Sequence, residues 1–332
     1  MSKKLYSTEK WKSHLKVRQD AEMRKAQERN REVRSHTYPR RSPRPKRDTI
    51  VLPLPNDFSI IHNPEETVQF LLDFENRSRK KNIKLDLSAL STITTDAIAA
   101  LIACIHRIRM TGTLVSGNSP NEESCKTILL QSGFFSHVRH RQALPSADKG
   151  KISQRESKKV EPKLAQELVH RGTAGIYGQP RKCQAAYRVL IESMTNTNNH
   201  AARSQFERET WWSTVYADTD RKAVCYTFLD TGVGIFKSVR LGTIRSAYQL
   251  AGRIFGFRSD ADILREILEG KVESSTGLKY RGKGLPAIYN RMKAGRIKSL
   301  VIVANRVYAN VSKGDFRMLN TDFRGTLLYW EA

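Results

Sequence analysis

The sequence predicts an α/β protein with two folded domains. Its 332 residues are enough for two domains of common size. Its composition is that of a globular protein, because 39% of the residues are apolar and 8% are aromatic. Strand-like and helix-like patterns alternate over residues 49–145 and again over 164–332, and a polar segment separates the two.

The chain is strongly basic. Lys and Arg number 58 against 33 Asp and Glu, which gives a formal net charge of +25. Such an excess predicts attraction to polyanions, either nucleic acid or an anionic membrane surface. The longest run without a charge or a strongly polar side chain, Ala97 to Ile105, is far shorter than the roughly 20 residues of a membrane-spanning helix. We therefore expect no transmembrane segment, and the lack of a secretory signal predicts a cytoplasmic location.

Residues 1–48 carry much of this charge, with 16 Lys or Arg against 6 Asp or Glu. Residues 8–33 have the pattern of a mostly polar helix, and Pro39, Pro43 and Pro45 break any helix after it. We expect a basic tail that is partly helical or disordered. Two interpretations stay open: a solvated extension, or an arm that neutralises nucleic-acid phosphates.

Residues 49–145 are predicted to form a small alternating α/β domain. Strands are expected at residues 49–54, 83–90 and 113–117, and a helix at 94–109. The helix has one apolar face, formed by Ile98, Leu101, Ile102, Ile105 and Ile108. Residues 146–163 have almost no apolar side chain, which predicts a polar linker.

Several short motifs in this first segment resemble a STAS domain, the sulfate-transporter and anti-anti-sigma-factor fold. The matching residues are Leu85, Asp86, Leu87, Ser88, Pro120, Ser132, Gly133 and Phe134. In anti-anti-sigma relatives a serine at the following helix start is phosphorylated, and Asp96 holds that place here. Asp96 is either a favourable charge at a helix N-terminus or a permanent mimic of the phosphorylated state, and Thr94 and Thr95 remain possible phosphate acceptors.

The cysteines and histidines indicate no transition-metal enzyme. Cys104, Cys125, Cys183 and Cys225 are far apart and form no CxxC pair, so we expect buried free thiols. The eight histidines include no HExxH pattern.

The clearest chemical signal is the predicted helix CQAAYRVLIESMTNTNNHAA over residues 183–202. At about 100° per residue, its polar side holds Glu192, Asn196, Asn199 and His200. The opposite side holds Cys183, Tyr187, Leu190 and Met194. Asn and Thr are poor helix formers, so their concentration near residue 196 favours a chemical role over a merely solvated face.

Two glycine clusters follow. Asp230, Gly232 and Gly234 come directly after an apolar predicted strand, where glycine lets the backbone approach a bound ring closely. The second cluster precedes a predicted helix, so its backbone N–H groups can hold phosphate beside two cations. Its members are Arg281, Gly282, Lys283, Gly284 and Leu285.

Together, and in this order, these motifs resemble the GHKL (Bergerat) ATP-binding fold, an α/β sandwich shared by gyrase, heat-shock chaperones, histidine kinases and mismatch-repair proteins. The resemblance covers roughly residues 165–332, and the first motif is most similar to that of anti-sigma-factor serine kinases. It implies that Asn196 binds Mg²⁺ and that Glu192 is the general base. Asp230 would accept a hydrogen bond from the adenine amino group, with Gly232 and Gly234 forming that wall.

The same resemblance implies that Gly282, Gly284 and the neighbouring N–H groups, Leu285 included, hold the phosphates of ATP. Lys283 or Arg281 would add positive charge. Thr326, after Gly325, would lie beside adenine, and residues 236–280 would take the place of the ATP lid, with a helix at 260–270. A structural role for His200 stays open. No phosphoacceptor-histidine hairpin or transducer domain accompanies these motifs, which disfavours a sensor kinase or a gyrase-type clamp.

Three functions remain in view. The first is a Mg²⁺-dependent ATP-binding or ATP-hydrolysing switch that acts through the STAS-like domain, docked near the lid, on a protein or nucleic-acid partner. The second is an anti-sigma-type serine/threonine protein kinase in a partner-switching system. The third is a nucleic-acid-binding component of a phage-defence or stress-response complex, in which ATP is structural. A homodimer is compatible with each of them.

Overall fold

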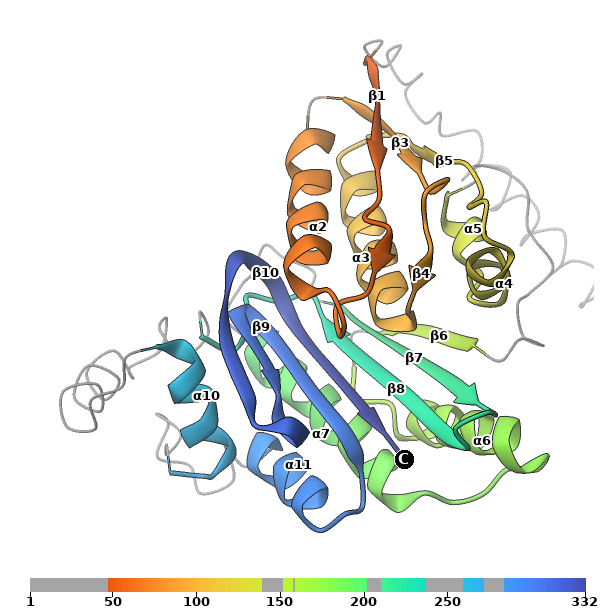
Figure 1. Cartoon of the computed structure of the whole chain (residues 1–332). Coiled ribbons are helices and arrows are strands. Elements are labelled where there is room, and N and C mark those ends of the chain that lie inside the picture. Colours follow the sequence, from red (N-terminus) through yellow and green to blue (C-terminus); the bar gives the residue numbers. More distant parts are fainter. Residues whose placement is uncertain are drawn as a thin grey trace, which may run out of the picture. The chain divides into compact units, whose positions relative to one another are not determined.

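A computed structural model describes residues 47–79, 81–138, 152–157, 159–201, 210–236, 259–271 and 284–332, and every structural statement below concerns these ranges (Figure 1). The protein is mixed α/β, with both parallel and antiparallel sheets. Residues Asp48–Ala332 form one compact unit. The helix and proline-rich segment expected within the basic tail lie outside the described residues.

We call residues 48–138 the first lobe. Its main sheet is parallel with the order β1-β3-β5, where β1 is Thr49–Pro53, β3 is Asn82–Asp86 and β5 is Val115–Gly117. A second parallel pair joins β2 (Asp57–Phe58) to β4 (Thr92–Ile93). The helices are α2 (Pro64–Ser78), α3 (Thr95–Met110), α4 (Glu123–Gln131) and α5 (Phe134–Val138). The three predicted strands and the predicted helix are confirmed, and the five apolar residues of the helix face are all buried.

Residues 152–332 form the second lobe, built on an antiparallel sheet with the order β6-β7-β8-β10-β9. Its strands are β6 (Ile152–Ser157), β7 (Trp211–Asp218), β8 (Ala223–Asp230), β9 (Lys298–Asn310) and β10 (Asp315–Glu331). Its helices are α6 (Pro162–Tyr177), α7 (Gln184–Ala201), α10 (Asp260–Leu268), α11 (Gly284–Lys293) and the short 3₁₀ helix η2 (Val311–Lys313).

The predicted polar linker over residues 146–163 is wrong for its second half. Residues 152–157 form β6 and pair with β7, and α6 begins at Pro162. Strand β6 lies at the edge of the sheet and has few apolar side chains, so its composition resembles that of a linker. There, backbone hydrogen bonds to a single neighbour hold a strand with few apolar side chains.

The two faces of the second-lobe sheet pack against different partners. On β8, Tyr226 and Phe228 lie in a core with apolar residues of α6, α7 and α11, whereas Cys225 and Leu229 lie in the core of the first lobe. This follows from the period of two along a strand. The sheet is therefore covered on both faces, and the two domains expected from the sequence share one continuous core.

Hydrogen bonds also join the lobes. The Tyr308 hydroxyl of β9 donates to the Ile61 carbonyl (2.9 Å), and the Asn320 N–H of β10 donates to Glu65 Oε2 (3.2 Å). Thr321 and Gln69 form a further side-chain hydrogen bond. In the described part of the chain, no helix combines the length and the apolar character needed to cross a membrane.

Asp96 is explained by burial. It is the second residue of α3, 1% exposed, and its Oδ2 accepts a hydrogen bond from the Ile60 N–H (2.8 Å). Burial raises the pKa of this carboxyl group. Asp96 lies in the first turn of α3, as the first interpretation expects, and it ties the loop before α2 to that turn. Its burial leaves the carboxylate no exposed surface for a partner outside this chain.

Candidate functional site

Helix α7 carries the first group of expected site residues. It buries one face on the sheet and on neighbouring helices, formed by Ala186, Val189, Leu190, Ser193, Met194 and Thr197. Glu192 and Asn196 are only half-buried, so the predicted division of the helix is confirmed at these positions. Cys183 precedes the helix, and the side chains of Asn199 and His200 lie outside the described ones.

The hydroxyl residues of α7 are accommodated by local hydrogen bonds. Ser193, Thr195 and Thr197 each donate to the carbonyl four residues earlier, at 2.8 to 3.1 Å. Such bonds satisfy a hydroxyl inside a helix without a partner elsewhere. The polar run is therefore compatible with a regular helix, and Asn196 is held at a fixed position on it.

Asp230 is the last residue of β8 and lies between two strands. It pairs with Trp211 of β7 and with Thr326 of β10. Strand alternation places Asp230 and Thr326 on the face that carries α6 and α7, because Phe228 and Leu328 belong to that core. Asp230 Oδ1 accepts a hydrogen bond from the Gly232 N–H (2.8 Å), which shapes the turn after the strand. The structure thus brings Asp230, Gly232 and Thr326 together, as expected.

Asn305 of β9 is a site residue that the sequence analysis missed. Its Oδ1 accepts a hydrogen bond from the Phe236 N–H (3.1 Å), and its Nδ2 donates to the Val233 carbonyl (2.9 Å). Asn305 is 4% exposed and has a φ of 51°. Gly234 has a φ of 84°, and a Cβ added to it would lie 2.6 Å from Asn305 Oδ1. The signal in the sequence was an amide directly after the apolar residues 300–304 of β9.

The second glycine cluster meets α7 at Gly284. This buried glycine is the first residue of α11, and a Cβ added to it would lie 2.6 Å from Asn196 Oδ1. Two motifs 88 positions apart in the chain are thus in direct contact. Leu285 packs against the second-lobe core. Arg281, Gly282 and Lys283 lie outside the described residues.

One helix connects the two halves of the site. Helix α7 packs against β8, which ends in Asp230, and against α11, which begins at Gly284 (Figure 1). Glu192 lies one turn before Asn196 on α7. A carboxylate and a hydroxyl thus lie on the sheet, and an amide and a second carboxylate lie on a helix that packs against β8.

The oxygen atoms of Glu192 and Asn196 fit a hard cation such as Mg²⁺, which prefers oxygen ligands and keeps several waters. Among the described residues there is no group of three or more His, Cys, Asp and Glu that could hold a metal ion.

The cysteines are free thiols, as expected, and Cys104, Cys125 and Cys225 are buried. Cys104 lies between the lobes, where its thiol donates to Glu75 Oε1 (3.3 Å). Burial strongly raises the pKa of this thiol, so it stays neutral. A neutral thiol is neither a nucleophile nor a metal ligand.

The expected helix at 260–270 is confirmed as α10. Ser259 and Asp262 form a reciprocal capping box at its start, and Ala261, Leu264 and Leu268 are buried. The helix packs against α11, β9 and β10. This part of the segment that the resemblance assigns to the ATP lid is therefore anchored on the second lobe.

Comparison with protein-family models, with curated proteins and with solved structures finds no match to this chain.

Proposed function

We propose that the second lobe binds a purine nucleoside triphosphate together with Mg²⁺, in the manner of the GHKL fold that its motifs resemble. We further propose that the first lobe, with its STAS-like motifs, passes the nucleotide state to a macromolecular partner. The observation that carries the proposal is the contact of Gly284 with the Asn196 amide. The motif that would bind Mg²⁺ and the motif that would bind the phosphates are far apart in the sequence, yet they lie against each other.

The base would bind at the sheet. The Asp230 carboxylate accepts hydrogen bonds, and Thr326 is its direct cross-strand neighbour. An exocyclic amino group is the donor that a carboxylate in this position would recognise. The turn at Gly232 and Gly234 has no side chain to keep a flat ring away, and Asn305 fixes its backbone.

The phosphates would bind where α7 and α11 meet. The first N–H groups of α11 have no partner within the helix, and the helix dipole favours an anion at this end. Asn196 would place its amide oxygen beside these phosphates, and Glu192 would take a proton from the attacking water. Bound Mg²⁺ would neutralise phosphate charge during transfer.

The sheet supports a route from the site to the first lobe. Asp230 follows Leu229, and the Leu229 side chain lies in the first-lobe core. A shift of β8 on nucleotide binding would therefore displace atoms packed against α3. In this arrangement the first lobe covers the sheet face opposite α7 and α11.

Titration of the full chain with ATP, with and without Mg²⁺, tests the proposal. We expect Asp230→Ala to abolish binding, because the adenine amino group loses its acceptor, and Asn196→Ala to remove the Mg²⁺ dependence. The matched controls are Asp220→Ala and Asn290→Ala, which change exposed residues away from the site. Wild-type protein that binds no ATP, or equal losses in variants and controls, would refute the proposal.

Hydrolysis and phosphotransfer are separated by ATP labelled on the γ-phosphate. We expect free labelled phosphate, and a loss of at least tenfold in its release for Glu192→Gln, since general-base catalysis typically contributes about 10²–10⁴-fold. Label that appears on a protein instead of in free phosphate would identify a protein kinase.

A further inference from the structure

We propose that the end of the helix layer remote from the candidate site binds the phosphate backbone of nucleic acid. The contact of Asn196 with Gly284 joins the late part of α7 to the start of α11, and Figure 1 shows α11 running back along α7 before the chain enters β9. The start of α7 and the end of α11 consequently lie together. Twelve residues of α7 separate Gln184 from Asn196, which corresponds to about 18 Å.

Acidic residues are missing from the two segments that meet at this end. The chain has 33 Asp and Glu in 332 residues, about one in ten, so 55 residues should contain about five. Residues 168–191 and 284–314 together contain none, and they carry ten Lys or Arg. A solvated surface without a partner usually mixes both signs of charge. This segregation therefore indicates an anionic partner.

The cations that define this basic surface are exposed. They are Arg181, Lys182 and Arg188 around the start of α7, and Arg296, Lys298 and Lys313 after α11. Lys313 belongs to this end because Ser312 donates a hydrogen bond to Met292 Sδ of α11 (3.3 Å).

These cations are also available for a partner. None of the six forms an ion pair with a described carboxylate. The nearby carboxylate of Glu331 is engaged by Arg221 at 2.9 Å and by Ser299 at 3.0 Å. Cations beside the start of α7 interact unfavourably with the helix dipole. Phosphate groups bound here would offset that repulsion.

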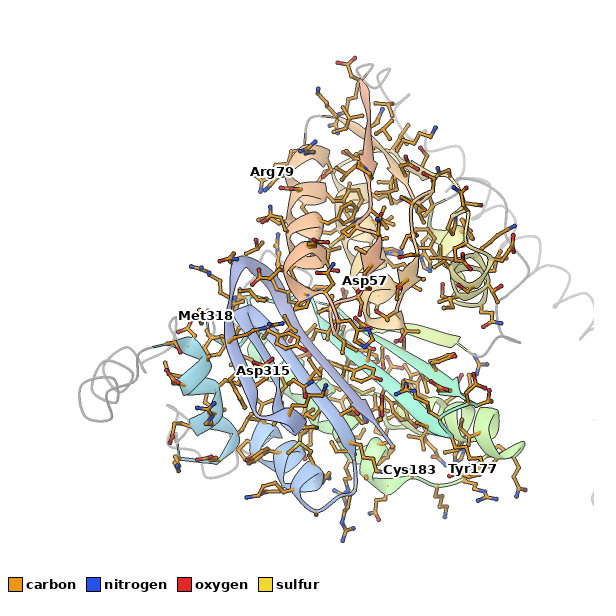
Figure 2. The ribbon with its side chains drawn as sticks, in the orientation of Figure 1. Asp57, Arg79, Tyr177, Cys183, Asp315 and Met318 are labelled. Atoms are coloured by element: carbon orange, nitrogen blue, oxygen red, sulfur yellow. The ribbon has the colours of Figure 1, made fainter. Side chains whose placement is uncertain are left out.

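The aromatic groups favour nucleic acid over a membrane. Tyr177, labelled in Figure 2, is 51% exposed. The Arg181 guanidinium lies over its ring at 4.1 Å from the centroid. Tyrosine and arginine faces are surfaces on which bases stack. Of the large apolar side chains that are exposed in the described ranges, Tyr177 alone lies at this end, so no exposed aliphatic side chain accompanies the cations, as an interfacial helix requires. We therefore expect binding without sequence preference, mainly through phosphates.

Salt-dependent binding of a fluorescein-labelled 20-base-pair DNA duplex and of the matching single strand tests this surface in the full chain. The test variant combines Arg181→Gln, Lys182→Gln and Arg188→Gln. The control combines Arg77→Gln, Arg79→Gln and Lys81→Gln, which removes equal charge from exposed positions of the first lobe. Each lost phosphate contact lowers the slope of log K against log[salt] by about 0.9 for a duplex. We expect a fall of up to about 2.7 in the test variant and an unchanged slope in the control.

A second variant, Arg296→Gln with Lys298→Gln and Lys313→Gln, reaches the same surface from α11 and serves if the first variant folds poorly. Equal slopes in test and control variants would overturn the inference, because charge alone, and not this surface, would then set affinity. Vesicles with and without phosphatidylserine provide the other decisive outcome: a loss of vesicle binding in the test variants, with DNA binding unchanged, would assign the surface to a membrane. Neither result depends on ATP binding, so the proposed function is judged separately.

Discussion

At the scale of single residues, Asn305 determines the backbone of the turn at Gly232–Gly234. Both ends of its amide are used, one as an acceptor from Phe236 and one as a donor to Val233. Its φ of 51° is uncommon for a residue with a Cβ, although Asn tolerates it better than most. The two hydrogen bonds of the Asn305 side chain offset the cost of this φ and of burying a polar amide among apolar neighbours.

We predict that Asn305→Ala lowers the free energy of unfolding by about 1–3 kcal/mol, because it leaves buried backbone groups without partners. We also predict that it weakens ATP binding at least tenfold. Asn305→Asp keeps the acceptor for Phe236 and should lose less affinity. Urea unfolding and ATP titration measure the two effects. Asn310→Ala is the control: Asn310 accepts from Lys313 N–H at the far end of β9, so it should change stability alone. Equal changes of affinity in both variants would contradict the prediction.

The residues recognised from the sequence are those whose neighbours are local or belong to a short motif. Asp230 and Gly232 lie within one turn, and Glu192 and Asn196 within one helix. Asn305 escaped because its partners lie 69 and 72 positions away. The hydrogen bond of Asp96 could not be foreseen for the same reason, since Ile60, which donates it, is 36 positions away. Contacts of this kind arise from tertiary packing, which the order of residues does not display.

At the scale of helices and strands, the crossing of α7 and α11 depends on a missing side chain. A Cβ at Gly284 would lie 2.6 Å from Asn196 Oδ1 and 2.7 Å from its Nδ2, closer than real Cβ contacts. The two helices can approach this far only because residue 284 is glycine.

We predict that Gly284→Ala displaces the Asn196 amide. Overpacking of this kind costs about 1–3 kcal/mol, and Mg²⁺-dependent ATP affinity should fall at least tenfold. Adding Asn196→Gly to Gly284→Ala makes room for the new Cβ, so part of the lost stability should return while the Mg²⁺ dependence stays absent. Thermal unfolding and ATP titration with and without Mg²⁺ measure both. A Gly284→Ala protein with wild-type affinity would show that the contact has no part in binding.

Strand prediction succeeded where burial was visible in the residue pattern. The alternating apolar residues of β3 and the apolar run of β8 indicated strands directly. Edge strand β6 has the sequence ISQRES, with one strongly apolar residue, and is held by its ladder with β7. Backbone hydrogen bonds do not depend on side-chain type, so no composition argument could identify this strand.

At the scale of the whole molecule, the two lobes are coupled through the sheet. Trp212 of β7 lies in the first-lobe core, and its ring contacts the imidazole of His106 of α3 at a centroid distance of 4.8 Å. A signal for this arrangement was present in the sequence. Most of β8 and residues 300–304 of β9 are apolar without alternation, the pattern of a strand buried on both faces. An independent second domain would show an alternating pattern with one polar face.

A pair of histidines lies at this interface. His106 Nε2 and His137 Nδ1 lie 3.1 Å apart, and both rings pack edge-on against Trp212. Burial, and then the charges of His106 and Arg109, lower the pKa of His137 to about 4 from its ordinary value of 6.5. Between these values the unfolded chain binds a proton that the folded protein does not bind, so stability is lost as the pH falls through this window.

We predict that acidification from pH 7 to pH 4.5 lowers the free energy of unfolding through His137. The upper bound is about 3 kcal/mol, and the effect should be smaller because solvent partly screens this side chain. His137→Phe should remove this loss, whereas His170→Phe, at a half-buried position on α6, should retain it. Urea unfolding of the three proteins across this range provides the measurement.

Asp96 acts with the opposite sign, because its raised pKa makes protonation in acid favour the folded state. The comparison therefore has to be made between variants, and parallel pH profiles for wild type and His137→Phe would show that the histidine pair does not control the interface.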